Sequence, residues 1–550
     1  MSDPDAIRAE VEAAAAREAE QRAADAKPKP APPSAPVITD ADIDAALSAN
    51  EYGDADLAVR LFGGKILRDN VEELNYVFDT SHWRLDKNHD YLRALRDVAD
   101  LFEGRAIRLY KDAKDANEEE AKDLRLKASA HKKRASRLRS TNGVRSMFKF
   151  ATAGKGSLGI SGDEWNRDPT MLPCANGVID LSTGKLHPGS PEQYFNKASP
   201  FVYTGLNADA PIWDATLDKI LLGHRELREY FEYFVGVAAT GIQTKDFFCA
   251  LGPLGNNGKS VVFDWLLKAL GDFAGTIKVE NLIEERNPRT PQAHDSHLIV
   301  LRGLRLAVTS EAQAKYRFSL AKIKAITAGG DSLRARDVGI RLQIEFTQTH
   351  SLVLHTNNLP QSDGVDSAFF SRLKVLPFKA MFINQADGPE VPGEHIYHAV
   401  PRQRLDKILA AESSGILAFV ARCARKFLLL GDMPPPPAIV QAETGEYRQD
   451  QDEAGMFLGQ CCDLIEEVKI QMRDLYNSYR KWSIVERGVP EKSVRSLKSF
   501  SGDLRNRKGI EKINSNVVYY KGISIKPEWQ VEAKQESLYG SERDARGRAD

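Results

Sequence analysis

The sequence predicts an α/β fold: a phosphate-binding core, a mostly helical region before it and a winged helix after it. Three observations lead to this prediction. An apolar segment at 247–251 runs into a glycine-rich loop and then into a helical pattern. Strand and helix patterns alternate over residues 246–380, as they do in nucleotide-binding α/β cores. Near the C-terminus, helical patterns precede VVYYKGISI, which predicts a strand pair.

The length of 550 residues exceeds that of one ordinary domain and predicts three or four. Changes in composition and periodicity suggest where the boundaries lie. The segments that we expect are an Ala- and Pro-rich disordered tail at 1–40, a helical N-terminal region at 41–160, a domain of a β-hairpin plus helices at 161–245, the phosphate-binding core at 246–395, a helical lid with a Pro-rich linker at 396–445, a winged helix at 446–530 and a loose tail at 531–550.

Local patterns justify the segments before the core. Capping acids open DADIDAALSAN as a helix, whereas YVFDTSHWRLDKN predicts a small strand or hairpin. Apolar and polar residues alternate around Asn-Gly and Thr-Gly turns in NGVIDLSTGKLHP, so this segment predicts a β-hairpin. Between Arg105 and Lys155 the balance is basic, with a cluster HKKRASRLR at 131–139. A solvated helix face is the favoured interpretation of this cluster, ahead of a contact with DNA or another subunit.

The composition excludes some classes of protein and leaves others open. The chain has 76 Lys and Arg against 77 Asp and Glu, so only the placement of charge can indicate a nucleic-acid partner. Five cysteines at unpaired spacings argue against zinc and for reduced thiols in a cytoplasm. No apolar run approaches the roughly 18 residues that span a bilayer, so we expect no membrane partner. The charged N-terminus also lacks a signal core.

The strongest motif is FFCALGPLGNNGKSVVFDWLLKAL, in the order strand, glycine-rich loop and helix. This order predicts a P-loop, in which backbone N–H groups and the helix N-terminus bind phosphates. Lys259 would bridge the β- and γ-phosphates of ATP, and Ser260 would hold Mg²⁺ through its hydroxyl. The loop departs from the usual spacing, so either it carries an insertion or Gly255 makes the tight turn. The candidate ATP-binding residues are Gly255, Asn257, Gly258, Lys259 and Ser260.

Two further strand ends supply polar candidates. Glu311 follows a short apolar strand at 304–308, where the neighbouring strand of a P-loop fold delivers an acid toward Mg²⁺ and the attacking water. It is therefore the predicted catalytic carboxylate and, with Ser260, a predicted Mg²⁺ contact. Asn357 stands at the tip of a third apolar strand at 350–355, where an amide can orient water or sense the γ-phosphate.

Arg372 lies about fifteen residues beyond Asn357 and completes the catalytic candidates. Its permanently charged, planar guanidinium suits the charge that develops on phosphate in a transition state. In a ring-shaped assembly, this residue would reach the ATP of a neighbouring subunit.

These motifs, in this order, resemble the superfamily-3 helicases, specifically the poxvirus-type and phage/plasmid primase-helicase C-terminal family. AVTSEAQ, KAITAGGDSLRAR, HTNNLP and FFSRLKVLPF resemble its acidic, family-specific, sensor and arginine-finger segments. DLYNSYRKWSIVERGVP resembles its winged-helix region. The resemblance covers roughly residues 50–530 and implies an AAA+-like helicase ATPase core at 246–395.

The resemblance also implies how the protein assembles and what it acts with. Its subunits are expected to form a homo-oligomeric ring, a hexamer, and to move along DNA with 3′-to-5′ polarity. The larger relatives carry a primase domain before this region. The N-terminal segment here is too short for one, so a separate primase or polymerase is the expected partner.

The family-specific segment suggests a DNA contact. SLRARDVGIRLQIEF predicts a strand, a tight turn at 337–339 and a second strand, with positive charge from Arg334, Arg336 and Arg341. The resemblance implies that such a hairpin faces a central channel and grips single-stranded DNA. Ion pairs that hold the turn are the alternative role for these arginines. Lys324 is a further candidate for phosphate contact, from an adjacent helix.

The expected function is ATP-dependent unwinding of single-stranded or forked DNA during replication of a phage, plasmid or other mobile element, in a bacterial cytoplasm. One alternative is a replication initiator that melts an origin. Another is an ATP-dependent helicase loader or a regulatory interaction protein. A small-molecule P-loop kinase would explain neither the hairpin nor the flanking domains.

Overall fold

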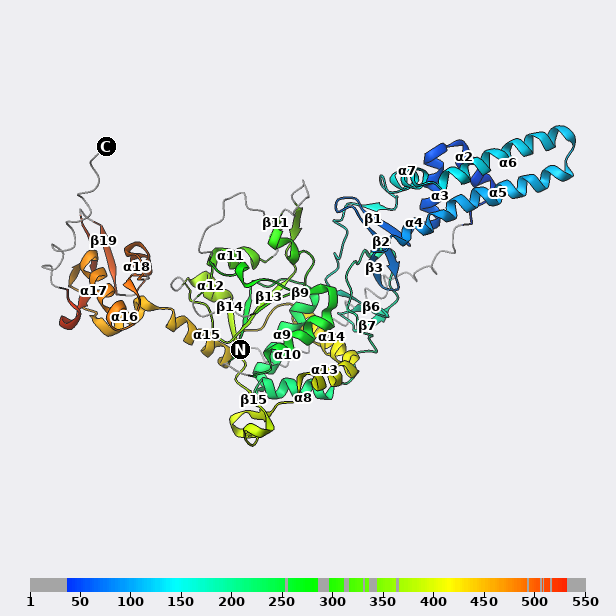
Figure 1. The fold of residues 1–550 in the computed structure, drawn as a ribbon. Helices are drawn as coiled ribbons and strands as arrows, with labels where there is room; N and C mark the ends of the chain where they lie inside the picture. Colours follow the sequence, from blue (N-terminus) through cyan, green and yellow to red (C-terminus); the bar gives the residue numbers. More distant parts are fainter. Residues whose placement is uncertain are drawn as a thin grey trace, which may run out of the picture.

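The computed structural model describes most of the chain and shows three regions in chain order: a helical N-terminal region, a central region around a sheet and a small C-terminal region (Figure 1). None of the helices in this described part is long and apolar enough to cross a bilayer. The described residues are 37–252, 256–284, 296–310, 316–329, 332–335, 344–362, 366–491, 494–504, 507, 509–514 and 517–531.

Helices make up most of the N-terminal region, as the sequence predicts. Helices α5 and α6 pack side by side as a long hairpin that extends away from the central region (Figure 1). Leu57, Phe102 and Met147 belong to the apolar core that joins α3, α5 and α7. The helices are α2 (Asp40–Ser48), α3 (Asn50–Phe62), α4 (Asp90–Ala94), α5 (Arg96–Asp115), α6 (Glu118–Leu138) and α7 (Thr141–Ala151).

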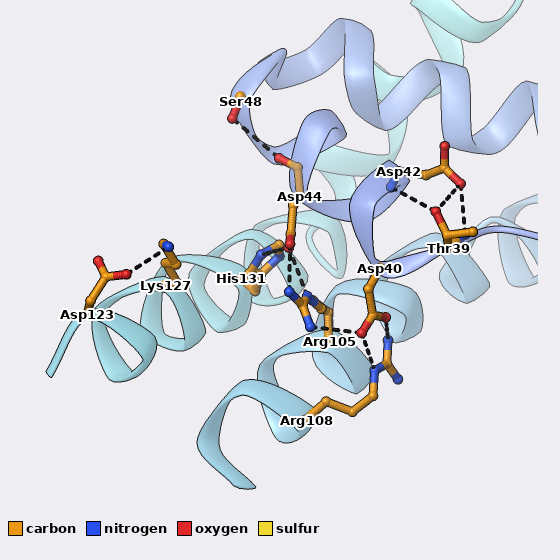
Figure 2. A network of polar contacts seen from close by, with 10 residues as sticks. All are labelled: Thr39, Asp40, Asp42, Asp44, Ser48, Arg105, Arg108, Asp123, Lys127 and His131. Atoms are coloured by element: carbon orange, nitrogen blue, oxygen red, sulfur yellow. Dashed lines mark hydrogen bonds and ion pairs between the residues drawn. The ribbon is translucent and has the colours of Figure 1, made fainter. Parts of the chain in front are cut away.

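Ion pairs attach α2 and α3 to the α5–α6 hairpin. Figure 2 shows Arg105 of α5 donating to Asp44 of α2 at 2.6 Å, and His131 of α6 lies 2.9 Å from the same carboxylate. Deeper in the region, Arg134 of α6 donates to Asp54 of α3 at 2.8 Å. These contacts join residues that are far apart in the sequence, so they fix the positions of the four helices.

The basic cluster HKKRASRLR lies at the end of α6 and has two uses. Its three arginines, Arg134, Arg137 and Arg139, each pair with carboxylates of α3 or α5. Lys132 and Lys133 are exposed and have no ion-pair partner among the described residues. A solvated helix face therefore describes only the lysines, because the arginines hold helices together.

Two small sheets connect the helical region to the core. The hairpin predicted from NGVIDLSTGKLHP is confirmed as β6–β7, and YVFDTSHWRLDKN, predicted as a small strand or hairpin, forms the hairpin β2–β3. The first sheet has the order β3-β2-β1-β4 and the second the order β5-β6-β7. Their strands are β1 (Ile66–Asp69), β2 (Leu74–Asp79), β3 (His82–Leu85), β4 (Gly159–Ile160), β5 (Met171–Cys174), β6 (Gly177–Asp180) and β7 (Lys185–His187).

The core is a five-stranded parallel sheet in the order β14-β8-β13-β10-β9. Apolar side chains cover both faces: Phe248 and Val353 pack toward α9, α10 and α14, whereas Phe247 and Leu352 pack toward α11 and α12. This arrangement confirms a mixed α/β fold that is consistent with a P-loop core. The strands are β8 (Phe247–Leu251), β9 (Ala274–Thr276), β10 (Leu306–Ser310), β13 (Ser351–Thr356) and β14 (Leu373–Pro377).

Helices and two strand pairs surround this sheet. Strands β11 and β12 pair antiparallel, which confirms the strands predicted from SLRARDVGIRLQIEF, whereas the turn at 337–339 lies outside the described residues. The surrounding elements are α8 (Pro211–Ile220), α9 (Arg225–Thr240), α10 (Lys259–Leu270), α11 (Leu320–Ile326), β11 (Ser332–Ala335), β12 (Ile344–Thr347), α12 (Ser367–Arg372), β15 (Met381–Ile383), β16 (Ile396–His398), α13 (Arg402–Ala411) and α14 (Ser413–Leu430).

The C-terminal region has its own apolar core, which includes Phe457, Trp482 and Phe500. The predicted pairing within VVYYKGISI is wrong, because β20 pairs with β18 and β19 whereas β21 pairs with β17. The chain turns at Gly522, where φ is +92°, and this turn sends β21 to a different partner. Helix α15 (Ala438–Asp450) leads into this region and itself packs on β14 of the core. The elements of the C-terminal region are α16 (Glu453–Cys461), β17 (Cys462–Asp463), β18 (Lys469–Gln471), α17 (Met472–Val485), α18 (Leu497–Leu504), β19 (Glu511–Asn514), β20 (Val518–Lys521) and β21 (Ser524–Ile525).

Candidate phosphate-binding site

The candidate site lies at the carboxyl edge of the parallel sheet, where the loop after β8 meets the end of β13. Leu251 at the end of β8 pairs with Thr356 at the end of β13. This register brings the glycine-rich loop beside Asn357, the residue that follows β13. Parallel α/β sheets bind ligands at this edge, outside the carboxyl ends of their strands.

Lys259 lies at the centre of the site. It is the first residue of α10 and is only 5% exposed. Its Nζ donates to Oδ1 of Asn257 and to Oδ1 of Asn357, each at 2.8 Å. Two predicted site residues that are 98 positions apart, Lys259 and Asn357, are thus in direct contact.

The charge of Lys259 has no carboxylate partner among the described residues. Burial lowers the pKa of Lys259 to about 8, because a buried ammonium group loses its hydration. The two amide oxygens accept its hydrogen bonds but carry no net charge. An anionic acceptor such as a phosphate oxygen would therefore stabilise this ammonium group more than its present partners do.

Close packing requires glycine at two positions of the loop. Gly258 has a φ of +80°, and a Cβ there would lie 2.4 Å from Cδ1 of Ile220 in α8. A Cβ at Gly252 would lie 2.4 Å from the carbonyl oxygen of Phe378, just after β14. The glycines at the two ends of the loop thus lie close to the chain that leaves the sheet and to α8, respectively.

Ser260 is exposed at the start of α10, so its hydroxyl is open to a bound group. The donor set of a buried lysine, an adjacent hydroxyl and a glycine-rich loop fits the phosphates of a nucleotide with Mg²⁺. Gly255 and Glu311 lie outside the described residues, so their predicted roles stay predictions.

The sequence predicts that the strand before Glu311 lies next to β8, but in the structure this strand, β10, does not pair with β8. Strand β13 lies between β8 and β10, because β8 pairs with β13 on one side and with β14 on the other. Ser310, the residue before Glu311, pairs with His355 near the end of β13. In this order β13, which leads to Asn357, separates β8, which leads to Lys259, from β10, which leads to Glu311.

Arg372 lies away from this cluster, at the opposite edge of the sheet. It ends α12, and the next residue, Leu373, pairs with Phe247 at the start of β8. The five residues of β14 separate the two edges by roughly 13 Å. Nη1 of Arg372 donates to the carbonyl oxygen of Ala368 at 2.8 Å, and its Nε is buried without a partner in the described part of the chain.

The predicted DNA-binding residues lie on or near the β11–β12 hairpin. Lys324 of α11 pairs with Asp366 at 2.8 Å. Arg334 is exposed on β11 and pairs at 3.1 Å with Glu345, the residue opposite it on β12. Both of these cations therefore have carboxylate partners within the chain. The remaining hairpin candidates, which lie outside the described residues, are Arg336 and Arg341.

Arg305 is a buried cation that the sequence patterns did not single out. Its guanidinium donates to the carbonyl oxygens of Ala239 at 2.7 Å and Met171 at 2.8 Å, just before β10. Burial lowers the pKa of Arg305. The contacts tie the strand that leads to Glu311 to α9 and β5. The apolar run LRGLRLAV contains the charge but gives no sign of its partners.

Comparison with known proteins relates the chain to viral proteins. Residues 55–222 match the domain family described as "D5 N terminal like". The chain is 26% identical to "Putative helicase L207/L206" of Acanthamoeba polyphaga mimivirus, over 57% of this chain and 33% of that protein. It is 24% identical to "Putative helicase 022R" of Frog virus 3, over 68% of this chain and 44% of that protein. The chain thus spans less than half of the length of these relatives.

Among solved structures, the chain is similar to the C-terminal region of NrS-1, with a TM-score of 0.33 and 13% sequence identity. That similarity covers 55% of this chain and 64% of the other. The sequence matches extend well beyond residues 55–222. The chain therefore contains a D5 N-terminal-like domain and is a distant homologue of viral proteins that are named "Putative helicase".

Proposed function

We propose that the chain is an ATP-dependent DNA helicase of the superfamily-3 kind, with ATP and Mg²⁺ as its cofactors. The observation that carries this proposal is Lys259, a buried ammonium group at the carboxyl edge of a parallel sheet. Two amide oxygens hold it, and it has no carboxylate partner among the described residues. The names of the viral relatives, which describe helicases, support the proposal.

Each residue of the site has a proposed part. Lys259 and the loop from Gly255 bind the phosphates, and Ser260 contacts Mg²⁺, which supplies positive charge beside them. Asn357 exchanges its hydrogen bond with Lys259 for one with the γ-phosphate or the attacking water. Glu311, which follows β10, is the proposed catalytic carboxylate.

Arg372 is the proposed arginine finger, acting on the ATP of a neighbouring subunit. Its position at the amino edge of the sheet supports this role, because the carboxyl edge of its own sheet is roughly 13 Å away. Its Nε also has no partner among the described residues. An assembly that brings the edges of different subunits together is therefore part of the proposal, and a hexameric ring is the form that we expect.

The β11–β12 hairpin is the proposed contact with single-stranded DNA. Phosphates would displace Glu345 from Arg334 and Asp366 from Lys324. The Arg334–Glu345 pair is exposed, and exposed ion pairs contribute little to stability, so that exchange costs little. Arg336 and Arg341 are proposed to add positive charge beyond the described strands.

The proposed cellular role is replication of a phage, plasmid or other mobile element in the cytoplasm of its host. Movement would be 3′ to 5′, and a separate primase or polymerase would supply the synthesis. The three-stranded β18-β20-β19 sheet and its helices are the proposed winged helix, which would bind DNA or a partner protein.

Strand displacement on forked DNA with ATP and Mg²⁺ tests the proposal. We expect the wild-type chain to unwind the fork and Lys259→Ala to lose both ATP hydrolysis and unwinding. Lys268→Ala is the matched control, because Lys268 lies near the other end of the same helix and is stacked on Trp265. It should retain both activities.

The result also separates the alternative functions. ATP hydrolysis by the wild type without unwinding of any fork, with either overhang, would overturn the helicase proposal and favour a loader or regulatory protein. Melting of duplex at one DNA sequence alone would favour an initiator. Equal loss of activity in Lys259→Ala and Lys268→Ala would show that the assay reports folding, not the phosphate site.

A further inference from the structure

Residues 124–162 form a segment without a single acidic residue. It contains ten Lys and Arg residues. Four of these pair with carboxylates that lie outside the segment: Lys127, Arg134, Arg137 and Arg139. The others are exposed and have no ion pair among the described residues: Arg125, Lys132, Lys133, Arg145, Lys149 and Lys155. The segment therefore carries more positive charge than the fold itself uses.

Helix α7 displays two of these cations on one face. Arg145 and Lys149 are one helical turn apart and both exposed, so their Cβ atoms lie about 6 Å from each other. Asn142, also exposed, lies one turn before Arg145. The opposite face of α7 is apolar and packs into the core of the N-terminal region through Val144 and Met147. The outward face is thus fixed by the burial of the inward one.

The loop after α7 extends this surface. Residues 153–156 are exposed, and Lys155 lies between Gly154 and Gly156, whose φ angles are +86° and +80°. Nothing lies within 4 Å of the position that a Cβ would occupy at either glycine. The backbone beside Lys155 is therefore open to close approach by a large ligand.

We infer that this surface, formed by Asn142, Arg145, Lys149 and Lys155 and named here the α7 face, binds the phosphate backbone of a nucleic acid. Guanidinium, ammonium and amide groups are the side chains that make most phosphate contacts. They act without regard to base sequence, and each neutralised phosphate releases a counterion. The contact lies in the N-terminal region, at the base of the α5–α6 hairpin (Figure 1), and is additional to the β11–β12 hairpin.

The same surface is poorly suited to a protein partner. Protein interfaces rely on a buried apolar or aromatic centre. None of the exposed large hydrophobic residues in the described part of the chain falls between Leu126 and Leu186. Interfaces with nucleic acid are more polar and far more positive, which matches the α7 face.

The salt dependence of DNA binding tests the inference. The full chain would be titrated into labelled forked DNA without ATP, at a series of KCl concentrations, as wild type and as Arg145→Ala/Lys149→Ala. We expect the slope of log Kobs against log [KCl] to become shallower by about 1.4 to 1.8, the value for two lost phosphate contacts. The charge-conserving Arg145→Lys/Lys149→Arg should keep the wild-type slope.

Lys111→Ala/Lys114→Ala is the matched control. It removes two exposed lysines from α5 of the same region, but Asp112 and Asp115 stand beside them, so we expect no change of slope. Equal slopes for all variants would overturn the inference. A loss of affinity with an unchanged slope would also overturn it. An altered assembly state of the variant in sedimentation would overturn it too, because the α7 face would then be a contact between subunits. DNA binding is measured here without ATP and does not depend on unwinding, so this test can still be interpreted if the helicase proposal fails.

Discussion

Arg134 in the N-terminal region and Lys259 in the core are both buried cations, but the chain treats them differently. Arg134 is 8% exposed and donates at 2.8 Å to the buried carboxylate of Asp54. Lys259 is 5% exposed and donates to two amide oxygens, with no carboxylate partner in the described part of the chain. One charge is neutralised within the fold, and the other is left for a ligand.

The difference shows how buried charge can be assigned to stability or to function. Burial raises the pKa of Asp54, whereas its ion pair with Arg134 opposes that shift. Such a pair holds helices in place, and removal of one partner leaves the other charge buried without a counter-ion. At Lys259 burial works against the charged form and nothing within the described fold repays it. Local conflict of this kind is expected at functional sites.

The largest effect that would sharpen the comparison is on stability. Asp54→Ala leaves the guanidinium of Arg134 buried without a counter-ion, so we expect about 3–5 kcal/mol of local destabilisation. Hydrogen exchange of α3 and α6 amides would measure it. Glu51→Ala is the matched control on the same helix, because Glu51 pairs with the exposed Arg137. Equal protection in both variants would mean that burial of the pair does not matter.

Lys259→Met should have the reverse pattern. Loss of the ammonium group should lower the rate of ATP hydrolysis about 10²- to 10³-fold, as loss of one transition-state donor does. Thermal stability should stay the same or rise, because a buried cation without a counter-ion is replaced by an apolar side chain of similar length. A clear fall in melting temperature would show that Lys259 stabilises the fold, and the contrast with Arg134 would then fail.

These two residues also show which features of the structure can be predicted from the sequence. The strand, loop and helix around Lys259 follow from local pattern, as does Asn357 at the end of a later strand. The contact between them depends on the pairing of β8 with β13, which local pattern does not fix. Arg134 stands in a basic cluster that resembles a solvated face. Its partner is on another helix, 80 positions away, and no local pattern identifies it.

The order of strands in the sheet could not be predicted from the sequence for a related reason. The strands β8, β10 and β13 are apparent as apolar runs, but each run is compatible with any neighbour. The order in which β13 separates β10 from β8 is decided by pairing between distant segments. Likewise, the pattern VVYYKGISI indicated two strands, but their partners β17, β18 and β19 come from elsewhere in the C-terminal region.

A smaller effect concerns pH and sharpens the contrast at Lys259. Its pKa is lowered to about 8, and the phosphates of a nucleotide favour the charged form. Nucleotide affinity should therefore fall as pH rises through 8, by up to about tenfold between pH 7 and pH 9. Calorimetric titration with ADP and Mg²⁺ would measure this change. Lys259→Arg is the control, because a guanidinium stays charged over this range. A wild-type affinity that is constant up to pH 9 would contradict the lowered pKa.

The same lysine should affect stability with the opposite slope. Without nucleotide, the folded chain releases the proton of Lys259 above about pH 8, whereas the unfolded chain keeps it until about 10.5. The unfolded state then binds more protons, so the free energy of unfolding should rise with pH in this window. Lys259→Met should lack that rise, which separates it from other titrations of the chain.

The smallest expected effect lies at Asp366, where the core also uses charge for structure. Its carboxylate accepts from the backbone N–H of Phe369 at 2.8 Å, which caps α12, and it pairs with Lys324. Asp366→Ala removes both contacts and should loosen α12 by about 1 kcal/mol, the usual worth of such a cap. Hydrogen exchange of the α12 amides would then quicken about fivefold.

Two control variants separate the cap from the ion pair. Asp366→Asn can still cap α12 but carries no charge, and Lys324→Ala leaves the cap untouched, so both should keep α12 protected. Because α12 ends at Arg372, a loosened helix should also disorder the proposed arginine finger. If Lys324→Ala frees α12 as much as Asp366→Ala does, the ion pair and not the cap holds the helix. DNA that bound Lys324 would then break its pair with Asp366 and loosen the helix that ends at Arg372. The charge of Lys324, like that of Lys259, would in that case serve a ligand and not the fold.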